Sequence, residues 1–173
     1  PFLGESAPSW LMAGTDLLFL PAVAASLAPA LWQGKARANR IFVPLLMIMA
    51  VANLYIHLQA NGWSNTGQQG VDAMLFLVVG LITLLGGRVI PFFTEGSIPG
   101  YQAKRYPSIE IAAIALVGGI VLIQLIQPSA QITAALAIGI AATQFFRLVG
   151  WYHHAIWQHP ILWVLYTAMA WII

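Results

Sequence analysis

Polar side chains that could carry chemistry lie within or at the edge of three consecutive apolar runs. They are Asp16, Asn53, His57 and Asp72. A charged or imidazole group inside a lipid bilayer is costly, so such residues are functional candidates by default. Asn53 and His57 are four residues apart and share one face of a helix. We expect the four residues to converge on one layer, in the external half of the membrane.

His57 is the main candidate for a metal ligand, because imidazole binds iron and copper well and this His lies well inside an apolar run. A metal-bound imidazole needs an acceptor that orients its second ring nitrogen, and Asp16 is a candidate for that role. Two plainer interpretations stay open: His57 packed against a backbone carbonyl or hydroxyl group, and Asp16 as a polar bridge between helices. One His on one helix is not by itself a metal site.

Two arginines indicate a second polar level on the opposite side. Arg88 lies at the end of the third apolar run, and Arg147 lies one turn after Gln144 at the end of the fifth. Each could extend to lipid headgroups or interact with a helix C-terminal dipole. Alternatively, two guanidinium groups at the mouth of a bundle could hold carboxylates, such as haem propionates, through bidentate hydrogen bonds.

Three histidines, His153, His154 and His159, lie in an aromatic joint between the fifth and sixth apolar runs. An aromatic belt at the membrane interface accounts for the Trp and Tyr residues of this joint. Each His is either an interfacial polar residue or a metal ligand. His153 and His154 are chain neighbours, so we expect them to point to different faces of a helix.

Six apolar runs must position these residues. They span 10–32, 41–60, 71–87, 109–127, 132–150 and 160–173. The joints between them are short, and we expect sequential helices to pack antiparallel in one domain. Pro91 is expected to force the chain out of helix after Arg88. Several small residues are expected to mark close helix contacts: Gly80, Gly86, Gly87, Gly118, Gly119 and Gly139.

The composition indicates an integral membrane protein of the all-α class, a bundle of about six transmembrane helices. Of 173 residues, 60% are hydrophobic and 7% are charged, whereas soluble domains carry roughly 25% charged residues. The lipid bilayer is therefore the expected partner. The last apolar run is shorter than the about 20 residues that a membrane span needs, and the chain starts at Pro1, so we expect it to be part of a longer protein.

The positive residues indicate an orientation. All seven Lys and Arg fall on one side of the expected bundle, in its joints or, for Arg147, at the end of the fifth helix: Lys35, Arg37, Arg40, Arg88, Lys104, Arg105 and Arg147. The positive-inside rule makes that side cytoplasmic and places the N-terminus of this segment outside. The charges form no basic run, which argues against a nucleic acid partner.

Other function classes are restricted by what the sequence lacks. Without Cys, the chain has no thiolate metal site, disulfide or cysteine nucleophile. It contains no P-loop, no dinucleotide-binding glycine pattern and no His-Glu-x-x-His motif. Redox or gas chemistry remains, together with two alternatives. One is half of a transporter or channel with a polar intramembrane path, and the other is a structural or assembly subunit.

The run from Gly86 to Thr94, Gly-Gly-Arg-Val-Ile-Pro-Phe-Phe-Thr, resembles the hallmark of the NnrS family. These are bacterial inner-membrane proteins that contain haem and copper and act in nitric oxide metabolism and nitrosative stress. The segments Asp16–Pro21, Ala52–Leu58 and His159–Leu165 resemble the family in the same order. The resemblance covers essentially the whole chain and corresponds to a C-terminal portion of a member with about twelve helices.

The resemblance implies a haem- and copper-associated protein of the bacterial inner membrane, with nitric oxide as a small ligand and a role in denitrifying-type metabolism. His57 and Arg88 are the positions carried over from the family's pattern. Tyr166 stands where the family pattern has a His, and Glu95-Gly96 replaces the usual Arg-Asn after Thr94. No ligand role is therefore assigned to Tyr166. Whether the protein is an enzyme and which oligomer it forms are not indicated.

Overall fold

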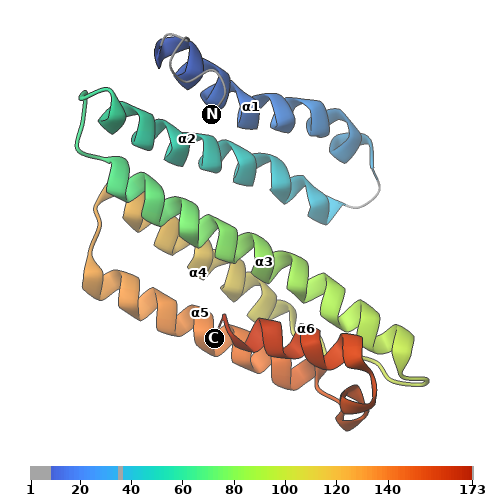
Figure 1. Cartoon of the computed structure of the whole chain (residues 1–173). Helices are drawn as coiled ribbons and strands as arrows, with labels where there is room; N and C mark the ends of the chain where they lie inside the picture. The colour runs from blue at the N-terminus through green and yellow to red at the C-terminus, as the bar shows by residue number, and fades with distance from the viewer. Residues whose placement is uncertain (1–8, 35–36, 173) are drawn as a thin grey trace. The chain divides into compact units, whose positions relative to one another are not determined.

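The structure is a computed structural model that describes residues 9–34 and 37–172. Its described residues form helices and contain no strand, which confirms the all-α prediction. The elements are α1 (Ser9–Gln33), the 3-10 turn η1 (Arg37–Ile41), α2 (Phe42–Ala60), α3 (Gly67–Ser97), α4 (Pro107–Ile126), α5 (Ala130–Trp151), the 3-10 turn η2 (His154–Gln158) and α6 (Pro160–Ala170) (Figure 1). Lys35 and Ile173, which belong to the predicted positive joint and to the sixth apolar run, lie outside the described residues.

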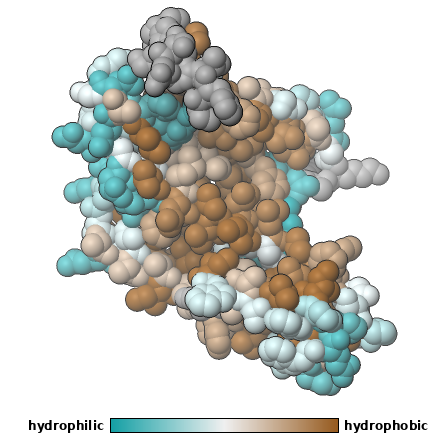
Figure 2. Space-filling model, in the orientation of Figure 1, coloured by the Kyte–Doolittle hydropathy of each residue, from teal (hydrophilic) through white to brown (hydrophobic). Residues whose placement is uncertain are grey.

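Within the described ranges, five helices, α1 to α5, are long and apolar enough to cross a membrane. They carry large apolar side chains on their outer surfaces, and Ile126 and Ile138 are 78% and 70% exposed. Figure 2 shows hydrophobic residues over much of the visible surface. Such a surface suits lipid and not water, so the chain is a multi-pass membrane protein. The sixth helix, α6, has 11 residues and is too short to span a bilayer alone.

By its internal contacts the chain divides into two compact units, Pro1–Met74 and Leu75–Ile173, with the boundary inside α3. In the first unit, α1 and α2 lie side by side and antiparallel (Figure 1). The side chain of Arg40 caps the C-terminal end of α1. Its Nη2 donates to the carbonyl oxygen of Trp32 (2.9 Å) and its Nε to that of Leu31 (3.4 Å). The last carbonyls of a helix have no partner within the helix, so this cation has a local structural role.

A tight turn joins α2 to α3, as predicted. Gly62 adopts φ 74°, a left-handed conformation that favours glycine. The backbone N–H of Gly67 donates to Oε1 of Gln59 (2.6 Å), which ties the first turn of α3 to the end of α2. This contact explains why α3 begins at Gly67, four residues before the predicted start.

Gly70 lets α3 approach α2 closely. A Cβ at this position would collide with the backbone carbonyl oxygen of Ala52, and would meet the side chains of Tyr55 and Ile56 at 3.0 Å. Ala52 itself is completely buried. The two helix backbones therefore touch here, in the way that small residues allow in membrane proteins.

In the second unit, small residues make some of the predicted close contacts. Gly80 of α3 faces Val117 of α4, and Gly139 of α5 faces Leu116 of α4, each so closely that a Cβ would crowd the neighbouring side chain. Gly118 is different, because a Cβ there would meet no atom within 4 Å. The predicted contact at Gly118 is therefore wrong, since the residue lies on an open face of α4.

The prediction that Pro91 ends the third helix is also wrong. α3 continues through Pro91 to Ser97. The segment is held by packing, because Ile90 and Thr94 are 2% and 0% exposed and the Thr94 hydroxyl lies 3.3 Å from the Tyr166 hydroxyl of α6. Membrane helices tolerate an internal Pro where neighbours and side chains compensate for the lost backbone bond.

One part of the core in this unit is a hydrophobic cluster around α6. It consists of Ile90, Ile98, Trp151, Ile156, Leu162, Tyr166 and Met169. These residues come from α3, the residue that follows it, α5, η2 and α6. The short helix α6 is therefore held in place by side-chain packing.

Replacing Gly70 with Ala tests the close approach of α2 and α3. We expect the free energy of unfolding in detergent to fall by about 1–3 kcal/mol, because the added methyl group must displace backbone atoms. Gly118→Ala is the matched control, since its methyl group enters open space. Thermal unfolding of both variants measures the difference, and equal melting temperatures would contradict the contact.

Candidate functional site

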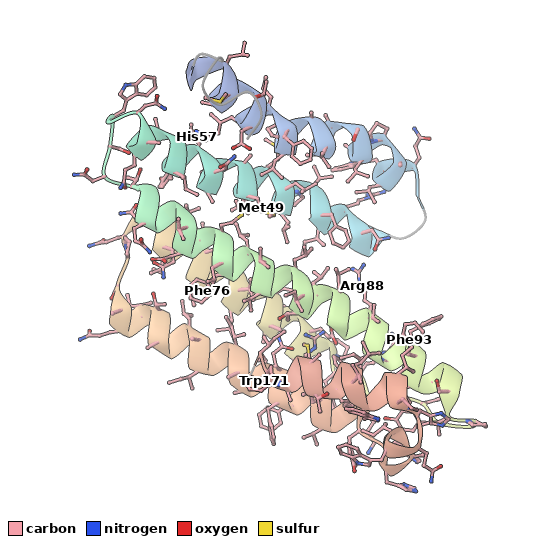
Figure 3. All side chains as sticks on the ribbon, viewed as in Figure 1. Met49, His57, Phe76, Arg88, Phe93 and Trp171 are labelled. Carbon is pink, nitrogen blue, oxygen red and sulfur yellow. The ribbon has the colours of Figure 1, made fainter. Side chains whose placement is uncertain are left out.

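A polar cluster joins α1 to α2. Asn53 Nδ2 donates to Oδ2 of Asp16, and His57 Nε2 bonds the same oxygen, each at 2.8 Å. The two α2 residues share a face because they are one turn apart, and Asp16 reaches them from the neighbouring antiparallel helix. Figure 3 marks His57 on α2. The predicted convergence of these three residues is confirmed.

The fourth predicted member of this layer, Asp72, has another partner. Its Oδ1 accepts a hydrogen bond from Nε2 of Gln68 (2.9 Å), four residues earlier on α3. This pairing arises because α3 starts at Gly67, which places Gln68 and Asp72 on one face within the first two turns. Asp72 therefore pairs within its own helix, and its place in one layer with Asp16, Asn53 and His57 stays a prediction.

The bond to Asp16 identifies one donor of the His57 ring. An ionised carboxylate only accepts hydrogen bonds, so Nε2 carries a hydrogen and donates it to Asp16. The side chains of His57 and Asp16 are 23% and 59% exposed, so the cluster lies at the surface of the α1–α2 pair. A carboxylate that holds one nitrogen of an imidazole is also found beside metal-binding histidines, where the second nitrogen is the ligand.

Arg147 forms a second polar site, inside the 75–173 unit. Its side chain is 5% exposed. Nη1 donates to Oε1 of Gln144 (2.8 Å) and to the carbonyl oxygen of Thr83 (3.3 Å), and Nη2 donates to Oε2 of Glu110 (3.3 Å). The guanidinium also lies 4.9 Å from the ring centroid of Trp151. Its bonds are therefore directed inward and not toward lipid headgroups.

Glu110, the counter-charge of Arg147, was not among the residues that the sequence analysis selected. It lies in the first turn of α4 and its side chain is 36% exposed. A signal was available, because Glu110 is the one acidic residue in the fourth apolar run and a buried Arg needs an acceptor. Arg88 lies half-buried on α3, next to Gly87 (Figure 3). An anion clamp formed by Arg88 and Arg147 stays a prediction.

His153 and His154 lie together, contrary to the prediction that they point apart. Their ring centroids are 4.6 Å apart, and the ring of His153 lies 5.0 Å from that of Tyr101. The prediction failed because α5 ends at Trp151 and His153 precedes the turn η2 in extended conformation, so helical spacing does not apply. Nδ1 of His153 accepts from the N–H of Ala155 (3.2 Å), which leaves Nε2 as its outward nitrogen.

Tyr101 does not supply a phenolate to this pair at neutral pH. Burial raises the pKa of Tyr101 above its ordinary value of 10.0, and the nearby charge of Glu95 raises it further. Among residues 9–34 and 37–172, no group of three or more His, Asp or Glu side chains is arranged to hold a metal ion. The two histidines could therefore contribute to a metal site but do not complete one within this part of the chain.

Tyr166 has a structural contact that the sequence did not suggest. Its hydroxyl group donates to the carbonyl oxygen of Trp151, at the end of α5, and also lies beside the Thr94 hydroxyl. The residue is thus a buried link between α3, α5 and α6. This assignment agrees with the absence of a ligand role for Tyr166 in the sequence analysis.

The model of the family described as "NnrS protein" matches residues 2–173. No curated protein and no solved structure matches this chain.

Glu110→Gln tests the ion pair with the buried Arg147. Gln keeps an acceptor oxygen but removes the charge that faces Arg147, so we expect a loss of about 1–3 kcal/mol in the free energy of unfolding. Glu95→Gln is the control, because its partner Arg105 is 53% exposed whereas Arg147 is 5% exposed, and pairs with an exposed arginine contribute about 0–1 kcal/mol. Denaturation in detergent compares the two, and a loss at position 110 no larger than that at position 95 would remove Arg147–Glu110 as a stabilising pair.

Proposed function

Because the chain belongs to the NnrS family, we propose that it is part of a haem- and copper-associated membrane protein of the nitric oxide response. Its role is protection against nitrosative stress in denitrifying-type metabolism. The observation that carries the proposal is the hydrogen bond from His57 Nε2 to Asp16. It prepares one histidine, on a membrane-spanning helix, to ligate a metal through Nδ1.

A haem iron fits this site better than a copper ion does. Haem iron takes its equatorial ligands from the porphyrin and needs only one or two axial ligands from protein, so a single His on one helix is sufficient. When bound, the haem supplies an iron centre for a small neutral gas. In this chain, Asp16 holds the proton on Nε2, and Asn53 holds Asp16 in place through the same oxygen.

The described residues do not form a full copper site. Copper in proteins needs two or more side-chain ligands in fixed geometry. The neighbouring, tilted rings of His153 and His154 offer two imidazoles without a third ligand among the described residues. These histidines are proposed contributors to a metal site.

The proposed location is the bacterial inner membrane, with the N-terminus of this segment on the periplasmic side. Five apolar helices support a multi-pass protein, and the Lys and Arg residues lie in alternate joints or in the helix halves that lead to them. The positive-inside rule assigns those joints to the cytoplasm. His57 and Asp16 then lie in the periplasmic half of the membrane, and Arg147 in the cytoplasmic half.

His57→Ala in the full-length protein tests the ligand assignment. We expect the Soret band of the purified protein to weaken strongly, because the axial nitrogen is lost. Asp16→Asn should lower haem affinity by about 10- to 100-fold, as loss of an orienting partner does. Thr15→Ala is the control and should leave the spectrum unchanged, since Thr15 is the chain neighbour of Asp16 but its hydroxyl donates to backbone carbonyl oxygens of α1.

An unchanged spectrum in His57→Ala would remove His57 from the site. A colourless, metal-free preparation from cells supplied with haem precursor and copper would contradict the proposed function. Solute flux into proteoliposomes without bound metal would instead favour the transporter or channel hypothesis. Loss of stability alone, after replacement of Asp16, Asn53 and His57, would favour a structural role.

A further inference from the structure

Three buried polar atoms around Arg147 have no hydrogen-bond partner within the described part of the chain. They are Oγ1 of Thr83, Nε2 of Gln144 and Nε of Arg147. The residues that carry them are 4%, 0% and 5% exposed. Buried donors left unpaired are strongly destabilising, and native proteins satisfy nearly all of them with protein atoms or ordered water.

The three residues that carry these atoms meet between α3 and α5. Nη1 of Arg147 bonds both the side chain of Gln144 and the carbonyl oxygen of Thr83, so all three residues meet at this guanidinium. The hydrogen bond from Arg147 to Gln144 also fixes the orientation of the Gln144 side-chain amide. Since Arg only donates, the oxygen of Gln144 must face it, and the amide nitrogen must point elsewhere with two free hydrogens.

The missing partner must be an acceptor. Arg147 Nε and Gln144 Nε2 can only donate, and the Thr83 hydroxyl can do either. The site is already neutral in charge, because Glu110 pairs with Arg147 at 3.3 Å. A second negative charge would be repelled by that carboxylate, whereas a neutral oxygen would not. This balance favours a neutral acceptor.

We propose that Thr83, Gln144 and Arg147 form a buried water-binding site between α3 and α5. A water molecule typically makes about three hydrogen bonds inside proteins, and these three residues, which contact one another, offer two unpaired donors and one hydroxyl group. The water would complete the hydrogen bonding of a cation that lies in a membrane-spanning helix. This site does not depend on the proposed haem ligand His57 or on its partners Asp16 and Asn53.

Two buried threonines of α3, Thr83 and Thr94, can be compared to test the proposal. Thr94 is buried and its hydroxyl has protein partners, the carbonyl oxygen of Ile90 and the hydroxyl of Tyr166. Thr83 is equally buried but has none within the described residues. Val is isosteric with Thr, so Thr94→Val and Thr83→Val remove the hydroxyl group with little change of volume.

We expect both variants of the full chain in detergent to melt about 2–6 °C below the wild-type protein, because each loses a hydrogen-bonded hydroxyl group. If Thr83 were truly unpaired, Thr83→Val would melt at or above the wild-type temperature, which would overturn the proposal.

The same melting experiment is repeated with sodium chloride or sodium phosphate, to test whether the site binds an anion. An anion that raises the melting temperature of the wild type but not of Thr83→Val would show that the site takes an anion, and would also overturn it.

A second measurement needs no variant to fold. Hydroxyl radicals formed by X-ray radiolysis of bound water oxidise the side chains beside it. We expect Trp151, which is 1% exposed but contacts the Arg147 guanidinium, to be oxidised in the wild-type protein. Leu162, which is 0% exposed and has no polar side-chain atom to bind water, should not be labelled. Absence of oxidation at Trp151, with the 91% exposed Trp171 labelled normally, would contradict a water at this site.

Discussion

The low polarity of the membrane interior is the constraint on which the rest of this structure depends. A polar group in a membrane-spanning helix finds no bulk water, so it must be satisfied by other groups of the protein or by bound molecules. Asp16 meets this constraint through Asn53 and His57, and Arg147 meets it through Glu110, Gln144 and the Thr83 carbonyl. The same bonds that make these charges tolerable also determine which helices are neighbours.

Hydropathy alone predicts most of the fold, because the membrane requires long apolar helices with short polar joints. Helix boundaries were less predictable, since they depend on tertiary contacts. Gly67 starts α3 early because a side chain of α2 binds its N–H, and α3 passes Pro91 because α6 packs against the next turn. Neither contact is encoded in the local pattern of either segment.

The candidate site was predictable where the pattern lies within one helix. The spacing of Asn53 and His57 determines that they share a face, and Asp16 was a reasonable partner because a neighbouring helix must supply an acceptor. Partners across helices were harder to predict, because they depend on how each helix is rotated about its axis. Asp72 is engaged by Gln68 on its own helix. Glu110 became relevant only once α4 and α5 were packed together.

The close approach of Arg147 to Gly87 has a consequence for how this sequence can vary. A Cβ at Gly87 would overlap the guanidinium group, so the arginine of α5 fills the volume that a side chain of α3 would otherwise occupy. Positions 87 and 147 therefore share one space. A relative with a larger residue at the first position should carry a smaller or differently directed one at the second, and the two columns of a family alignment should covary.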